Sequence, residues 1–341
     1  MPFNQEKQVT FYPTYGYQYD GNWHIPLRIW VREPADFPLR MASKLIRRML
    51  RNRAGLDALT PEQKALFKHR TEAFIADQES FEHVRFVFDQ DPEQTVFSLS
   101  DAAGNNKTDF NGLLSGELVL SESKAAQILA AQPNDPWLTI RAVSKHHTGV
   151  GRIRLIPPLG MSVVSDIDDT IKVTGFVEGS DAVLRRTFFE EFIPAPGMAA
   201  MYQAMGNDTA FHYVSGGPWQ MYPVLAEFLF GPQAGFPLGS MHMKSVRTHL
   251  FESESYDDIW RLLAGGSGKM TIMQKNEQIS ALLSHFPQRK FVLIGDSGEY
   301  DPEIFSAVRE QHVDQIHEIR IRDVAGDAGT DRLAGMKVIE V

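Results

Sequence analysis

The chain has 341 residues and no cysteine, with 43% hydrophobic residues, 23% charged residues and a formal net charge of −9. This length leaves room for two domains, and the composition is ordinary for a globular protein. The lack of cysteine excludes disulfides, thiol catalysis and cysteine-ligated zinc, and the negative charge argues against nonspecific binding of nucleic acid. Residues 1–19 do not read as a secretion leader, and no apolar run is long enough to cross a bilayer, so we expect a soluble, cytoplasmic protein.

The first part of the chain, residues 1–158, predicts a β-rich domain. Turn-forming stretches such as Asp101–Asn106 separate segments in which apolar and polar residues alternate, which is typical of an antiparallel sandwich. We therefore predict a β-sandwich-like N-terminal domain that joins the rest of the chain near Pro157–Gly160. Its expected strands are Trp23–Val31, Val84–Phe88, Thr95–Leu99, Gly116–Leu120 and Trp137–Val143.

A helical insertion interrupts this domain between about residues 40 and 76 and is split near Thr60-Pro61. Met41, Leu45 and Met49 share one face of its first helix. A basic amphipathic helix is able to lie on an anionic membrane surface, which makes this helix the best candidate for a peripheral membrane contact. The alternative is that the apolar face packs on the sandwich while the charges are solvated, and the shortness of the helix favours it. The basic residues around the face are Lys44, Arg47, Arg48, Arg51 and Arg53.

The chemistry begins in the second part of the chain, residues 159–341. Val163 and Val164 end a short buried strand, and Asp166, Asp168 and Asp169 follow at once. Carboxylates this close together repel each other and raise one another's pKa unless a cation holds them. The pattern predicts a divalent metal and acid–base chemistry at the edge of the core.

Two further strands end in polar residues. Phe211–Val214 leads into Ser215, and Phe291–Ile294 leads into Asp296 and Asp301. The continuous apolar run of the second is typical of a central parallel strand that is covered on both faces. Because ligands of open α/β sheets bind at the carboxyl ends of the strands, we expect these polar groups to share one site.

An amphipathic helix lies between these two strands. Its apolar residues follow the i, i+3, i+4, i+7 rule, and Lys275 stands at its beginning. The N-terminus of such a helix faces the same sheet edge, so Lys275 joins the candidate residues. The apolar positions are Ile279, Leu282, Leu283 and Phe286.

In order, these motifs resemble those of the haloacid dehalogenase superfamily of phosphotransferases. The matching residues are Asp166, Asp168 and Thr170 for the first motif, Ser215 for the second, Lys275 for the third, and Asp296 with Asp301 for the fourth. A finer resemblance, from about Met161 to Val324, is to the catalytic domain of the actin-patch-type phosphatidate phosphatases. It rests on the phrases Ser165–Lys172, Pro196–Met198, Phe211–Ser215 and Gly295–Glu299. The resemblance implies a Rossmann-like, parallel-sheet α/β domain over residues 159–341.

The resemblance also implies an activity, that of a magnesium-dependent phosphomonoesterase. Asp166 would be the nucleophile and become an aspartyl-phosphate, while Asp168 would serve as general acid and then general base. The expected substrate is a phospholipid, phosphatidate, which would be dephosphorylated to diacylglycerol. The implied phosphate-binding residues are Ser215, Gly216 and Lys275, and the implied Mg²⁺ ligands are Asp166, Asp168 (through its backbone carbonyl), Asp296 and Asp301, with Thr170 completing the catalytic motif.

The residues alone leave several alternatives open. Asp169 is equally able to cap the next helix, and Asp301 precedes a proline and a glutamate as a helix-capping residue would. Ser215 is open to interpretation as a turn residue, and Lys244 competes with Lys275 for the role of motif lysine. For the function, the alternatives are the same chemistry on a soluble phosphomonoester, and a non-catalytic module that binds lipid or protein.

Overall fold

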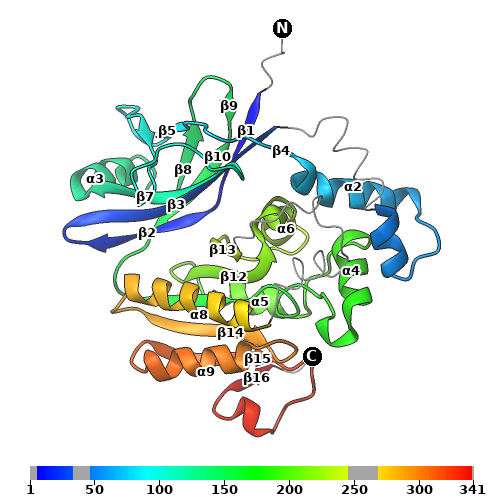
Figure 1. The fold of residues 1–341 in the computed structure, drawn as a ribbon. Coiled ribbons are helices and arrows are strands. Elements are labelled where there is room, and N and C mark those ends of the chain that lie inside the picture. The colour runs from blue at the N-terminus through cyan, green and yellow to red at the C-terminus, as the bar shows by residue number, and fades with distance from the viewer. Residues whose placement is uncertain (1–5, 34–46, 245–267, 340–341) are drawn as a thin grey trace. The chain divides into compact units, whose positions relative to one another are not determined.

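The computed structural model describes residues 6–33, 47–244 and 268–339 (Figure 1). The chain divides into two compact units, each made of two separate segments. The first comprises Met1–Asp36 and Ala76–Pro158, and the second comprises Phe37–Ile75 and Leu159–Val341.

The first unit is built on a ten-stranded sheet with the order β6-β5-β8-β10-β2-β3-β1-β9, in which β4 and β7 also pair with β3. Most neighbours are antiparallel, whereas β10 with β2 and β1 with β9 are parallel. The elements are β1 (Lys7–Phe11), β2 (Thr14–Tyr19), β3 (Asn22–Glu33), β4 (Asp77–Gln78), β5 (Arg85–Phe88), β6 (Phe97–Ser98), β7 (Leu113–Ser121), α3 (Glu122–Ala130), β8 (Trp137–Ala142), β9 (His147–Thr148) and β10 (Val150–Leu155).

The core of the first unit follows from the two-residue period of its strands. Along β3, Ile25, Leu27 and Ile29 are buried and alternate with the half-buried Pro26 and Arg28. Phe11 of β1 meets Phe86 of β5 edge-on with 5.8 Å between ring centres, although β8, β10, β2 and β3 separate these strands in the sheet. The sheet is therefore strongly curled, with its two ends facing each other across the core.

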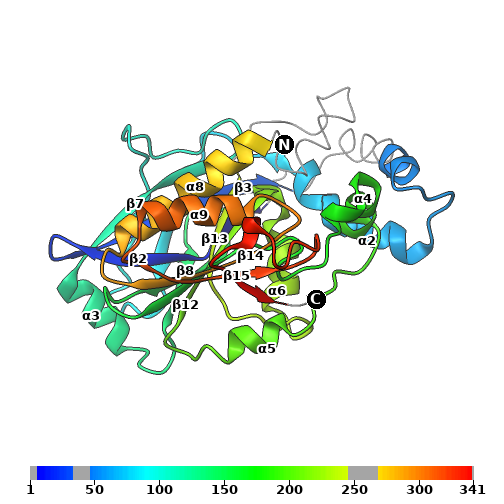
Figure 2. The ribbon, with the colours of Figure 1, turned by 90° about the horizontal axis from the view of Figure 1, so that it is seen from below.

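The second unit contains a six-stranded parallel sheet with the order β13-β12-β11-β14-β15-β16. The predicted α/β fold with a parallel sheet is thus confirmed. Figure 2 shows α8 and α9 side by side on one face of this sheet and α5 on the other. The strands are β11 (Met161–Ser165), β12 (Ala210–Pro218), β13 (Ser240–Lys244), β14 (Lys290–Asp296), β15 (Ile316–Arg322) and β16 (Lys337–Ile339). The helices are α2 (Pro61–Ile75), η1 (Phe176–Glu178), α4 (Ser180–Phe188), α5 (Met198–Gln203), η2 (Trp219–Met221), α6 (Tyr222–Phe230), α8 (Gly268–His285), α9 (Asp301–Gln311) and η3 (Asp331–Leu333).

The helical insertion packs on the second unit, whereas the sequence analysis places it within residues 1–158. Phe67 of α2 stacks on Phe189 with 5.4 Å between ring centres and lies 6.0 Å from Phe188 at the end of α4. Chain order alone does not reveal this, because an apolar helix face packs on whichever core complements it. The buried cluster consists of Leu50, Ala54, Phe67, Leu184, Phe188 and Phe189.

The described residues include only the second part of the predicted basic helix. Residues 47–53 are helical, while Met41, Lys44 and Leu45 lie outside the described residues. Leu50 is buried in the cluster of the second unit, whereas Arg48 and Arg53 are exposed. The apolar side of this part of the helix therefore faces protein.

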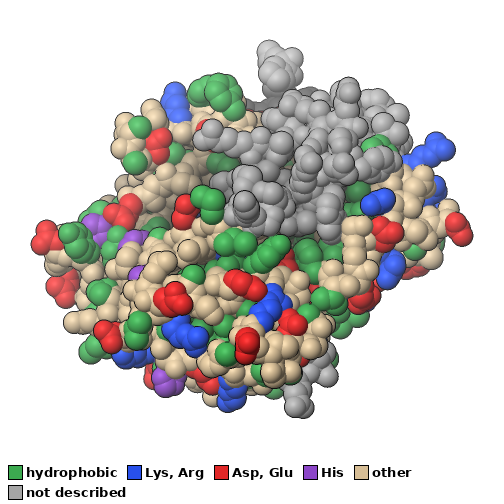
Figure 3. Space-filling view, turned by 60° about the horizontal axis from the view of Figure 1, so that its bottom comes forward, with side chains coloured by type: hydrophobic (Ala, Val, Ile, Leu, Met, Phe, Trp, Pro, Cys, Tyr) green, Lys and Arg blue, Asp and Glu red, His purple; other side chains and the backbone are tan. Residues whose placement is uncertain are grey.

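The surface shows no strong separation of charge on the face drawn in Figure 3, where acidic and basic side chains are interspersed over the described residues. Within residues 6–33, 47–244 and 268–339, no helix is both long and apolar enough to span a membrane.

The packing of the insertion predicts the effect of Phe67→Ala. Removing this fully buried ring should lower the free energy of unfolding by about 3–5 kcal/mol and speed hydrogen exchange across α4. Urea unfolding and hydrogen-exchange mass spectrometry measure both effects. Lys68→Ala, an exposed change on the same helix, is the control and should cost less than about 0.5 kcal/mol. Unaltered exchange in α4 would show that α2 does not support the second unit.

Candidate active site

The candidate site forms where two neighbouring strands end. Ser165, the last residue of β11, is level with Ile294 of β14, and the backbone N–H of Asp166 donates to the carbonyl of Ile294 at 2.9 Å. Asp296 is the last residue of β14. The parallel register therefore carries both carboxylates to the same sheet edge, where the sequence analysis expects them.

Lys275 lies between two buried carboxylates, about two turns into α8 and not at its beginning as the sequence predicts, because the helix already starts at Gly268. Its Nζ is 2.6 Å from Oδ1 of Asp166 and 2.8 Å from Oδ1 of Asp301. All three side chains are at most 4% exposed. Lys244 ends β13, which is two strands away from β11 in the sheet. The geometry therefore favours Lys275 over Lys244 as the motif lysine.

Asp301 is the first residue of α9, and both of its oxygens are engaged. Besides the contact of Oδ1 with Lys275, Oδ2 accepts a hydrogen bond from the backbone N–H of Asp296 at 3.3 Å. Its clearest role is to fix the lysine and the end of β14, which is neither of the two roles weighed from the sequence. Its contact with a metal stays a prediction.

The Asp168 side chain contacts residues other than Lys275. Its Oδ1 accepts hydrogen bonds from Thr174 Oγ1 at 2.6 Å and from Lys172 Nζ at 2.7 Å. Burial raises the pKa of Asp168, but the nearby Lys172 ammonium and the hydrogen bonds lower it below its usual value. Asp168 is therefore ionised at neutral pH in the empty site, and its side chain is 21% exposed.

Asp169 organises the loop after the first motif. Its backbone is left-handed with φ 52°, and its carboxylate accepts hydrogen bonds from the backbone N–H groups of Thr174, Gly175 and Phe176. Its carbonyl accepts a hydrogen bond from Arg322 at 2.7 Å. The N-cap residue of the short helix η1 is Gly175, so Asp169 is not its cap, although the carboxylate accepts a hydrogen bond from the first N–H of that helix.

Thr170 and Ser215 complete the residues expected from the sequence. Thr170 Oγ1 donates to Oδ2 of Asp296 at 3.3 Å, so it orients that carboxylate. Ser215 lies on β12, next to β11, and its Oγ accepts a hydrogen bond from the N–H of Gly217 at 3.0 Å. That contact is typical of a turn residue, and the hydroxyl proton of Ser215 is a further donor beside the half-buried Gly216.

Glu299 is a site residue that the sequence analysis missed. One oxygen each from Asp166, Asp296 and Glu299 lie within 4.8 Å of one another. The loop that carries Glu299 folds back because Oδ1 of Asp296 accepts hydrogen bonds from the N–H groups of Gly298 and Glu299, at 2.7 and 3.2 Å. Arg332 of the η3 helix donates to the carbonyls of Ser297 and Glu299 and so fixes the loop. The available signal was a second acid, after Asp296, within the Gly295–Glu299 phrase.

Burial makes this cluster electrostatically strained. It raises the pKa of Asp166 and of Asp296 well above their usual values, and neighbouring carboxylates add to the effect. The same causes raise the pKa of Glu299 to about 8. Burial lowers the pKa of Lys275, but Asp166, Asp301 and Glu299 raise it well above its usual value, so the lysine stays charged.

The cluster fits a hard divalent cation. Oδ2 of Asp166 is buried and has no hydrogen-bond partner within the part of the chain that the structure describes. An unpartnered buried carboxylate oxygen is costly unless a cation or proton meets it. Carboxylate oxygens are the ligands that Mg²⁺ prefers, so Asp166, Asp296 and Glu299 are suited to hold it.

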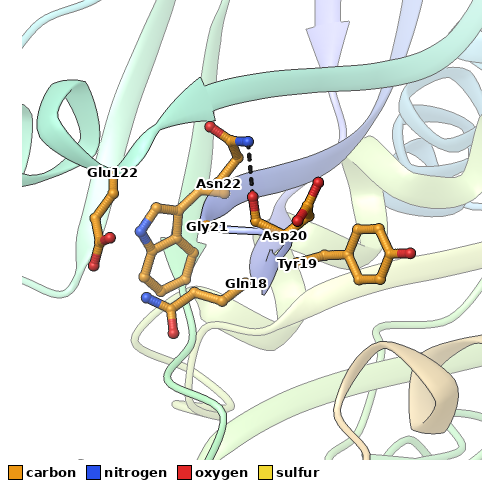
Figure 4. A pocket seen from close by; sticks show the side chains of 7 residues that line it. Gln18, Tyr19, Asp20, Gly21, Asn22 and Glu122 are labelled. Carbon is orange, nitrogen blue, oxygen red and sulfur yellow. Dashed lines mark hydrogen bonds between the residues drawn. The ribbon is translucent and has the colours of Figure 1, made fainter.

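A shallow pocket also lies in the first unit, at the turn between β2 and β3. It has a volume of about 220 Å³. Figure 4 shows Tyr19 pointing away from Glu122 of α3, and Asn22 donating to the carbonyl of Asp20. Because its polar groups do not converge on one point, we assign it no role. Its lining residues are Gln18, Tyr19, Asp20, Gly21, Asn22, Trp23 and Glu122.

Comparison with known proteins finds matches over the part of the chain that carries this site. Residues 161–323 match the family model described as the catalytic domain of phosphatidate phosphatase APP1. Residues 161–323 thus resemble an APP1-type catalytic domain. The chain is 30% identical over 171 residues to the phosphatidate phosphatase APP1 of Saccharomyces cerevisiae. It is 28% identical over 173 residues to an uncharacterized protein of Schizosaccharomyces pombe.

Each of these two alignments covers 49% of this chain and 26% of the relative. The chain therefore spans about a quarter of the length of the curated relatives it matches. The resemblance predicted from the four motifs is confirmed. The insertion that carries α2, and η3 with Arg332, both lie outside the matched residues.

The raised pKa values predict how cation binding depends on pH. When no cation is bound, Glu299 takes up a proton as the pH falls below about 8, and this proton competes with the cation. The affinity for Mg²⁺ should therefore weaken by about tenfold for each pH unit below that value, and binding should release protons. Calorimetric titration with Mg²⁺ in buffers of different ionisation enthalpy measures both quantities. Glu299→Gln should bind more weakly with a flatter pH dependence, and an affinity that is independent of pH would contradict this account.

Proposed function

We propose that this chain is a magnesium-dependent phosphomonoesterase of the haloacid dehalogenase type, which acts through an aspartyl-phosphate on Asp166 and dephosphorylates phosphatidate to diacylglycerol. The observation that carries the proposal is the buried Asp166, held by Lys275 on one oxygen and unpartnered on the other. The order of the parallel strands, with β11 and β14 adjacent, supports the haloacid dehalogenase assignment. The curled sheet of residues 1–158 supports a sandwich-like N-terminal domain.

Asp166, Asp296 and Glu299 would hold the Mg²⁺ ion, with the Asp168 carbonyl and Asp301 as further candidates. A bound Mg²⁺ supplies positive charge that lets a carboxylate approach a phosphate dianion. Oδ1 of Asp301 is paired with the Lys275 ammonium, which favours a role for Asp301 in holding Lys275 over a role as a metal ligand.

The protein residues carry the two half-reactions. In the first, a carboxylate oxygen of Asp166 forms a bond to phosphorus while the bond from phosphorus to the ester oxygen breaks, and Asp168 gives that oxygen a proton. Asp168 is ionised in the empty site, and the negative charge of an incoming phosphate favours its protonation. In the second, Asp168 takes a proton from water, the water oxygen bonds to phosphorus, and the bond to Asp166 breaks to release phosphate.

Three residues are suited to bind the transferring group. Ser215 is the last residue of the buried stretch of β12, Gly216 follows it at the same sheet edge as Asp166, and both would donate hydrogen bonds to phosphoryl oxygens. The Lys275 ammonium would balance the charge of the phosphate, and it opposes the rise in the pKa of Asp166 that burial causes.

The lipid substrate rests on the printed name of the S. cerevisiae relative, of which the chain covers a quarter. A phospholipid phosphatase must reach a membrane surface, and the exposed Arg48 and Arg53 are candidates for a peripheral contact. The rival substrate is a soluble phosphomonoester. A non-catalytic binding module is disfavoured, because burying Asp166, Asp296 and Lys275 together is costly without a use for them.

Phosphate release from a panel of esters tests this proposal. Wild-type protein should release phosphate from dispersed phosphatidate faster than from glycerol 3-phosphate, a sugar phosphate or a nucleotide, and a chelator should stop the reaction. Asp166→Asn should lower the rate by roughly 10⁴-fold or more, because the amide is not a nucleophile. Asp314→Asn, a change of the same type at an exposed position, is the control. Turnover that survives in Asp166→Asn would refute the mechanism, and a preference for soluble esters would refute the lipid.

A further inference from the structure

Arg70 is a buried arginine on α2, in the insertion, and it reaches the end of α4. It is 3% exposed, and its Nη1 donates to the carbonyls of Arg186 and Thr187 at 3.0 and 2.9 Å. These carbonyls belong to the last turn of α4, where backbone acceptors lack partners within the helix and where positive charge is favourable. Arg70 therefore fixes the C-terminal end of α4.

The same guanidinium group lies against Phe192. The Cζ atom of Arg70 is 3.8 Å from the centre of the Phe192 ring, which is also packed edge-on against Phe228 at 5.4 Å. Burial lowers the pKa of Arg70 to about 10, with Glu191 and Glu190 acting in the opposite direction, so the group is charged at neutral pH. A desolvated cation over an aromatic face is a strong restraint on the ring.

Phe192 in turn adjoins Lys172, the partner of Asp168. Lys172 Nζ is 5.1 Å from the centre of the ring and 2.7 Å from Oδ1 of Asp168, and it also donates to Thr174. An ammonium group has three donors, so contact with the ring is compatible with the two bonds to oxygen. The backbone segments that carry Lys172 and Phe192 are also hydrogen-bonded to each other, because the N–H of Val173 donates to the carbonyl of Ile193 at 2.9 Å.

We propose that Arg70 is a positioning residue for Asp168, acting through Phe192 and Lys172. This inference rests on the proposed function, in which Asp168 protonates the leaving oxygen. Arg70 holds the ring, the ring limits where the Lys172 ammonium lies, and Lys172 holds Oδ1 of Asp168. The insertion lies outside residues 161–323, so a segment beyond the family match supports the acid–base residue.

The dependence of the rate on the leaving group tests this assignment. An alkyl phosphate needs a proton on its leaving oxygen, whereas p-nitrophenyl phosphate needs it far less. The ratio of kcat/KM for the two esters reports on Asp168 and does not depend on the fraction of folded enzyme. Asp168→Asn should lower the alkyl-to-aryl ratio by about 100-fold or more.

Arg70→Ala should lower the same ratio by about tenfold, because it displaces the acid without removing it. Phe192→Leu should have a similar effect, and the double variant should show little more than either single change. Arg70→Lys, which keeps a cation on this side chain, should recover part of the ratio. Glu72→Gln, an exposed change on the same helix, is the control and should leave the ratio unaltered.

Equal losses on both esters in Arg70→Ala would overturn the assignment while leaving the proposed function intact. An unchanged ratio in Asp168→Asn would overturn it by removing the acid from the scheme. Wild-type protein that releases no phosphate from either ester would refute the proposed function and this inference together.

Discussion

The ion triad Asp166–Lys275–Asp301 is the interaction on which the candidate site depends. Two carboxylates share one ammonium group here, and each of the three side chains is at most 4% exposed, so removing Lys275 would leave two buried carboxylates without a cation. The triad joins the end of β11, the middle of α8 and the beginning of α9 at one point. It also sets the state of the proposed nucleophile, since Lys275 is the main group opposing the rise in the pKa of Asp166.

Around this triad the structure separates two kinds of carboxylate. Burial keeps Asp296 and Glu299 high in pKa and short of positive charge, which suits them to a cation. Asp168 instead has its own ammonium partner in Lys172 and is partly exposed, which suits it to exchange protons with substrate and water. One sheet edge thereby supplies both candidate metal ligands and a candidate proton carrier. Two arginines outside the matched residues contact the segments beside them: Arg332 donates to the carbonyl of Glu299, and Arg70 lies against the ring of Phe192.

The site residues at the ends of strands are the ones that the sequence predicts best. Asp166, Ser215 and Asp296 each follow an apolar strand, and the register of parallel strands brings such positions together. Glu299 was missed because its approach depends on a loop folded by hydrogen bonds to Asp296, which leaves no periodic signal. The insertion was assigned to the wrong unit because the partners of Phe67 lie more than a hundred residues away. In the first unit, β1, β2 and β10 were missed; buried and less buried residues alternate in β1 and β10, whereas β2 has no such alternation.

The central claim is that Asp166 receives the phosphoryl group while Lys275 contacts it. A crystal structure of the protein with Mg²⁺ and beryllium fluoride, which mimics a phosphorylated carboxylate, tests this most directly. The account predicts a beryllium adduct on the Asp166 carboxylate, with Lys275 against its fluorines and the cation on Asp296. An adduct on another side chain, or Asp166 still paired only with Lys275 under saturating conditions, would contradict it.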